Sequence, residues 1–138
     1  MHYHGYFWRG SEARRIREEV DGHVRGEGFA SSDIPPIKTC WWLRRPEGVI
    51  AGTWSDASEA VHWMAERYGT FADALADPHP FWKPKAARRA AAARHLADGR
   101  DISWSYHLRD DERAFVAAVC CSPNAWEDIP CPFTRGRA

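Results

Sequence analysis

Two histidines near the start of the chain are the first residues whose type and spacing suggest chemistry. His2 and His4 are two positions apart, so on an extended strand both imidazoles lie on one face. Neutral imidazole is a common metal ligand, and His107, on the polar face of a later predicted strand, could be a third. No acidic ligand stands beside the first pair, and solvated histidines are the simpler interpretation. We therefore expect no bound metal and no cofactor.

The four cysteines do not show the close Cys-x2-Cys pairs that are typical of structural zinc sites. They are Cys40, Cys120, Cys121 and Cys131. Strand alternation sends the adjacent thiols of Cys120 and Cys121 to opposite faces, so at most one of them could join the other two. We interpret the cysteines as small buried hydrophobes. Since the N-terminus does not resemble a signal peptide, we expect reduced thiols and a cytoplasmic protein.

A basic segment is the main candidate for contact with nucleic acid. The alanine-rich stretch 85–98 favours a helix. Its polar side is basic and carries four residues that could meet phosphates: Lys85, Arg88, Arg89 and His95. Three aromatic residues of predicted strands could stack on bases: Tyr6, Trp8 and Trp54. However, 19 basic residues are balanced by 19 acidic ones, so the chain lacks an overall basic footprint.

Tryptophan and arginine point instead to contacts with a protein. The chain has eight tryptophans, and all but three of its basic residues are arginines, which also suggests a GC-rich genome. Both residue types dominate the energetics of protein interfaces. The candidate contacts lie on a predicted helix and in a proline-rich segment: Trp63, Arg67, His79, Phe81 and Trp82.

No specific catalytic motif accompanies these residues, because a nucleophile elbow, a phosphate loop and a His-Glu-x-x-His helix are all missing. Our leading hypothesis is therefore a small non-enzymatic binding or accessory module that acts through a protein partner or by self-association. The first alternative is a nucleic-acid-binding domain that uses the basic helix and the strand aromatics. The second is a small histidine-dependent hydrolase or metal enzyme that uses His4 and His107.

Periodicity and capping residues predict the elements that must position these side chains. Strands are expected at 2–8, 40–44, 49–54, 102–108 and 114–121. Ser11 should begin a first helix, with Ile16 and Val20 facing inward. Asp56 should begin a second helix, whose apolar stripe runs from Ala57 to Tyr68 and which Gly69 should end.

The order of these elements resembles a split βαβ plan. We expect one α+β domain over residues 1–138, with a mainly antiparallel five-stranded sheet, two or three helices packed on it, and a ferredoxin-like core extended by a C-terminal strand. A chain of this length can bury a substantial core. No apolar run reaches the ~20 residues of a membrane span, so we expect no membrane contact.

Overall fold

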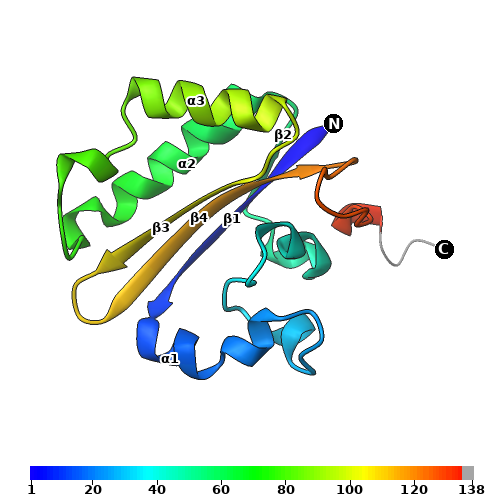
Figure 1. The fold of residues 1–138 in the computed structure, drawn as a ribbon, viewed down its shortest axis with the longest axis horizontal. Coiled ribbons are helices and arrows are strands. Elements are labelled where there is room, and N and C mark those ends of the chain that lie inside the picture. The colour runs from blue at the N-terminus through cyan, green and yellow to red at the C-terminus, as the bar shows by residue number, and fades with distance from the viewer. Residues whose placement is uncertain (135–138) are drawn as a thin grey trace.

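The computed structural model describes residues 1–134, apart from the side chain of Trp82. Its centre is an antiparallel sheet of four strands in the order β2-β1-β4-β3 (Figure 1). The strands are β1 (His2–Ser11), β2 (Gly52–Trp54), β3 (Ile102–Leu108) and β4 (Glu112–Cys121). The α+β class is confirmed. A fifth strand and the ferredoxin-like core are not confirmed among the described residues. A split βαβ unit links two parallel strands with another strand between them, whereas here β1 and β2, consecutive along the chain, pair directly and antiparallel.

Helices cover the two faces of the sheet unequally. The α-helices are α1 (Glu12–Arg17), α2 (Ala57–Phe71) and α3 (Ala86–Ala97). Short 3₁₀ helices occupy much of the remaining chain: η1 (Glu19–Gly22), η2 (Phe29–Ser31), η3 (Thr39–Arg44), η4 (Glu47–Val49), η5 (Ala72–Ala74), η6 (Pro80–Trp82) and η7 (Pro132–Thr134). Helices α2 and α3 lie together on one face. The 3₁₀ helices η1–η3 and the C-terminal tail, residues 122–134, lie on the other (Figure 1). No helix of residues 1–134 has the length and apolar character needed to cross a membrane.

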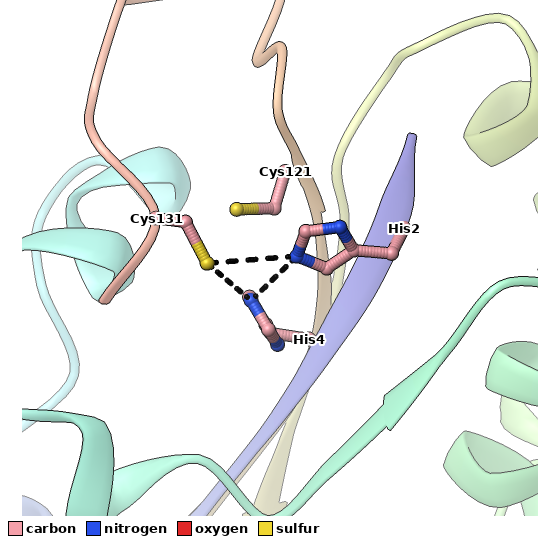
Figure 2. A group of neighbouring side chains, drawn as sticks. All are labelled: His2, His4, Cys121 and Cys131. Carbon is pink, nitrogen blue, oxygen red and sulfur yellow. Dashed lines mark hydrogen bonds between the residues drawn. The ribbon is translucent and has the colours of Figure 1, made fainter. Parts of the chain in front are cut away.

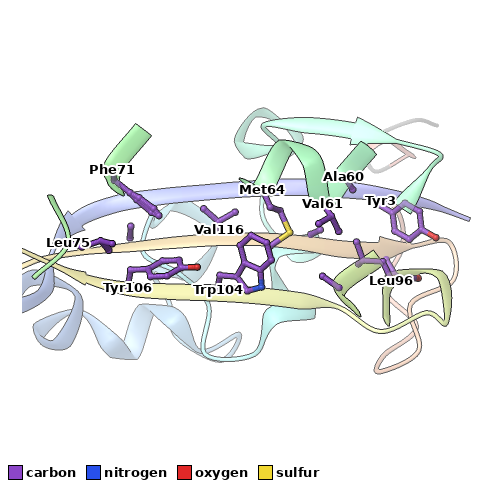
Figure 3. Close-up of a cluster of buried hydrophobic side chains, with 14 of the residues drawn as sticks. Tyr3, Ala60, Val61, Met64, Phe71, Leu75, Leu96, Trp104, Tyr106 and Val116 are labelled. Atoms are coloured by element: carbon purple, nitrogen blue, oxygen red, sulfur yellow. The ribbon is translucent and has the colours of Figure 1, made fainter. Parts of the chain in front are cut away.

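The first core lies between the sheet and the pair α2–α3 (Figure 3). Asp56 begins α2 as predicted, since its Oδ1 accepts from the backbone N–H groups of Ser58 and Glu59 at 2.7 and 3.3 Å. Val61 and Met64 of the predicted stripe are buried against the sheet. We expected α2 to end at Gly69, but the helix continues to Phe71 because its buried side chains hold it against the sheet.

The second core lies on the opposite face and overturns the predicted strand 40–44. That segment is the 3₁₀ helix η3. Cys40 and Leu43 are buried three residues apart, as are Trp42 and Arg45, the residue that follows the helix. With three residues per turn, the two members of each pair lie on the same side of the helix. The buried Arg45 guanidinium donates to two backbone carbonyls and lies 4.2 Å from the centre of the Phe29 ring. Of the predicted strand 49–54, only Gly52–Trp54 is a strand, which is β2.

Helix α1 turns a different face inward from the one predicted. Ser11 caps α1, as expected, but Ile16 is 58% exposed and Val20 is 68% exposed. Glu12 lies inward instead, because Arg15 and Arg113 both donate to its carboxylate. In α3 the buried residues are Ala92 and Leu96.

Candidate metal centre

The pairing of the first and last strands brings four potential metal ligands together. His2 lies directly opposite Cys121 in the β1–β4 ladder, and His4 follows two positions along on the same face. The tail then returns past this end of the sheet and places Cys131 beside them (Figure 2). The donor atoms of these four residues all lie within 4.8 Å of one another.

The separations between donor atoms are short and similar. Nε2 of His2 is 3.1 Å from Nε2 of His4, and Sγ of Cys131 is 3.6 Å from the first nitrogen and 3.5 Å from the second. Figure 2 shows these three atoms as a closed triangle with Cys121 beside it. A tetrahedral zinc ion with bonds of about 2.0–2.1 Å to nitrogen and about 2.3 Å to sulfur has edges of roughly 3.3 Å between nitrogens and 3.6 Å between nitrogen and sulfur. The separations of the three atoms are therefore close to those between three corners of a zinc tetrahedron.

Neighbouring side chains orient the imidazole of His4. Its Nδ1 lies 2.8 Å from Oγ1 of Thr53 on β2, in hydrogen-bonding contact. In metal sites such a bond fixes the tautomer and leaves the other nitrogen as the ligand. The ring of Phe133 packs edge-on against the His4 ring, with centroids 5.0 Å apart. The His4 ring is thus held from two sides with Nε2 directed at the cluster.

Burial controls the protonation of the site. Burial, followed by the charge of His2, lowers the pKa of His4 to about 4, and burial also lowers the pKa of His2. Both imidazoles are therefore neutral near pH 7, which is the form that binds metals. Burial, followed by the neighbouring Cys131 thiol, raises the pKa of Cys121 to about 12. A bound divalent cation reverses this effect, since a coordinating thiol loses its proton.

His107, the third predicted histidine, is far from the cluster. It pairs with Arg113 on β4, whereas His2 pairs with Cys121, eight positions further along the same strand. At about 3.3 Å per residue this is a separation of roughly 26 Å. The exposed imidazole lies 3.8 Å from Glu12 instead. The structure therefore gives no support to a joint site of His4 and His107.

The residues predicted to contact nucleic acid do not share one open surface. Tyr6 and Trp8 are buried, with Tyr6 stacked on Trp42 at a centroid distance of 4.9 Å, so neither ring can stack on a base in this structure. The Arg88 guanidinium lies 4.8 Å from the centre of the Trp104 ring, and Nη2 of Arg89 is 3.0 Å from His62. Of the remaining candidates, Lys85 and His95 are exposed, and Trp54 is half-buried.

The residues predicted to contact a protein fall on two segments. On α2, Trp63 is half-buried and the exposed Arg67 places its guanidinium 5.8 Å from the Trp63 ring centre. In the connection between α2 and α3, His79 is exposed and Phe81 is 73% exposed. The side chain of Trp82 lies outside the described part of the structure.

Sequence reasoning found the two histidines but did not join Cys121 and Cys131 to them. The local signals were a His-x-His pair on a strand and a cysteine that ends the last strand. No local pattern indicates that these two strands pair. The histidines lie 117 to 129 positions before the cysteines in the chain, so the sequence does not predict the register that brings them together. No protein family, curated protein or solved structure was found to match the chain.

Proposed function

We propose that this chain is a zinc-binding, non-enzymatic module in which one zinc ion joins the C-terminal tail to the first strand. The observation that carries the proposal is the convergence of His2, His4, Cys121 and Cys131 within 4.8 Å. A ligand set of two histidine nitrogens and two cysteine sulfurs favours zinc among the common metals. The ligands come from β1, the end of β4 and the tail, so the ion would connect parts of the chain that are distant in sequence.

The separations favour a single ion over an iron–sulfur cluster. In a two-iron cluster with two histidines on one iron and two cysteines on the other, the histidines and cysteines lie on opposite sides of the cluster. Here Sγ of Cys131 is only 3.5–3.6 Å from both histidine nitrogens. These are edges of one coordination sphere.

A structural role is favoured because the protein supplies four ligands. Catalytic zinc keeps a position open for water or substrate, whereas structural zinc is closed by four side chains. A closed site supports the non-enzymatic part of our leading hypothesis, and a cytoplasmic location would keep its thiols reduced.

The proposal is tested by measuring metal content and affinity. The full chain is purified, its metals are determined by elemental analysis, and zinc affinity is measured against a chromophoric chelator. We expect one zinc per chain and a loss of affinity of at least about 100-fold in His2→Ala and Cys131→Ala, because each removes a direct ligand. Both residues are only half-buried, so these variants should fold.

Two matched variants serve as controls. His107→Ala removes an exposed histidine, and Cys120→Ala removes a buried thiol on the other face of the sheet. Both should bind zinc as the parent does. A protein that takes up no metal when supplied with zinc, or a Cys131→Ala variant with unchanged affinity, would overturn the proposal.

A further inference from the structure

A second feature, separate from the metal centre, is a surface groove between the end of β2 and one side of α2. Its lining residues are Trp54, Asp56, Ser58, Glu59, His62, Trp63 and Glu66, and its volume is about 450 Å³. This volume is within the usual range for ligand sites, about 300–1,000 Å³. All of the lining residues except the two tryptophans are exposed. We call it the Trp54–Trp63 groove.

The indole rings of Trp54 and Trp63 pack directly against glycines of β1 and β2. A Cβ atom at Gly52 would lie 2.5 Å from Cη2 of Trp54, and one at Gly5 would lie 2.7 Å from Cζ3 of Trp63 and 2.8 Å from Cζ3 of Trp54. The rings lie against each other with centroids 5.1 Å apart. They are therefore fixed in place before any ligand arrives, which reduces the ordering cost of binding.

Carboxylates line the groove beside the indoles. His62 and Trp63 lie three and four positions after Glu59 and four and three before Glu66, so these four residues share one side of α2. Asp56 adds a third carboxylate at the start of the helix. His62 is occupied by contacts to Glu66 at 2.8 Å and to Arg89 at 3.0 Å. Two partly exposed indole rings beside carboxylates form an environment that attracts an organic cation.

At the Trp63 ring itself, the chain already places one cation in this way. Arg67, one turn beyond Trp63 on α2, holds its guanidinium 5.8 Å from the centre of the Trp63 ring. Its charge and that of Arg89 offset part of the charge of the three carboxylates, so we expect weak affinity for an isolated cation. Additional contacts from a protein that carries the cation would raise this affinity.

We propose that the Trp54–Trp63 groove binds the cationic side chain of a lysine or arginine on a protein partner. The inference rests on the proposed binding function but does not depend on the metal. Charge complementarity selects a basic group, and the shallow, exposed rim admits a side chain that projects from another protein surface.

The test is a titration of the full-length protein followed by ¹H–¹⁵N NMR of the indole N–H groups. The probes are N-acetyl-lysine N-methylamide and N-acetyl-arginine N-methylamide, with N-acetyl-norleucine N-methylamide as the neutral control. We expect saturable shifts of the Trp54 and Trp63 signals with the two cationic probes. The signal of Trp126, which is 64% exposed elsewhere, should not move.

Charge variants complete the test. Glu59→Gln and Glu66→Gln change exposed side chains and should raise Kd at least about 5-fold. Glu47→Gln, an exposed carboxylate outside the groove, should leave Kd unchanged. Equal binding of the neutral probe, shifts that do not saturate, or unchanged Kd in both groove variants would overturn the inference. Zinc content measured on the same sample shows separately whether the metal proposal holds.

Discussion

Tyr3 and His4 are neighbours in the chain but serve opposite faces of the sheet. Tyr3 packs under the helices in the first core, whereas His4 points to the other face and meets Cys131. Cys120 and Cys121 divide in the same way, which the alternation of strand side chains predicted. At this scale a single position decides whether a side chain supports packing or joins the proposed metal ligands.

Thr53 provides a test at the residue scale. Its hydroxyl is 2.8 Å from Nδ1 of His4, so Thr53→Val should lower zinc affinity by about 10-fold while retaining the side-chain shape. Thr53→Ser should restore most of the affinity because it keeps the hydroxyl. Affinity is measured by competition with a chelator. Thr70→Val, whose hydroxyl bonds only within α2, is the matched control and should bind zinc normally.

At the scale of elements, tertiary packing changed the ends and types of several predicted segments. The segment 39–44 contains β-favouring tryptophans, yet it forms a 3₁₀ helix because this places Trp42 and Leu43 in the second core. Helix α2 passes through Gly69 because packing holds the helix on both sides of this residue: Met64 before it and Phe71 after it are buried. Local propensity is weaker than such burial.

Gly69 therefore provides a test at the element scale. A Cβ at this position would meet nothing within 4 Å, and the backbone does not have a positive φ. Gly69→Ala should raise the free energy of unfolding by about 0.5–1 kcal/mol. Gly99→Ala should lower it, because Gly99 has φ +84° after α3. Urea denaturation measures both, and a destabilised Gly69→Ala protein would contradict the assigned helix.

Across the whole molecule, the sheet separates two cores, and the tail closes the second one. Ile129 is buried in that core, and Asn124 donates to the Cys120 carbonyl at 2.8 Å. Glu127 accepts from Lys38, Trp41 and Arg44 at 2.8, 3.0 and 3.2 Å. The proposed zinc ion would add a further attachment at Cys131. Polar contacts at Asn124 and Glu127 thus hold the tail in place, and the proposed metal would hold it at Cys131 as well.

The attachment at Glu127 should depend on pH. Hydrogen bonds from Lys38, then from Trp41 and Arg44, lower the pKa of this carboxyl to about 2. Because the pKa is lower in the folded protein than the unfolded value of about 4.3, the contribution is present above pH 4.3 and is lost as pH falls toward 2.

Glu127→Gln tests this dependence. The difference in unfolding free energy between the parent and Glu127→Gln should be largest at neutral pH and should shrink between about pH 4.3 and pH 2. Denaturation at a series of pH values measures it. Glu47→Gln is the matched control, because it makes the same substitution at an exposed glutamate away from the Glu127 contacts. A difference that stays constant over this range would contradict the role assigned to Glu127.

The sequence alone determined the features that depend on neighbouring residues. It predicted the cap at Asp56, the inward stripe of α2, the helix of 85–98 and the alternating strand 102–108, because capping and periodicity act over a few positions. Only the tertiary structure decided that segment 39–44 forms a 3₁₀ helix. It also decided that His4 lies beside Cys121 and Cys131, and that Trp63 packs against Gly5. These depend on which distant segments pack together, and that choice minimises the free energy of the whole chain.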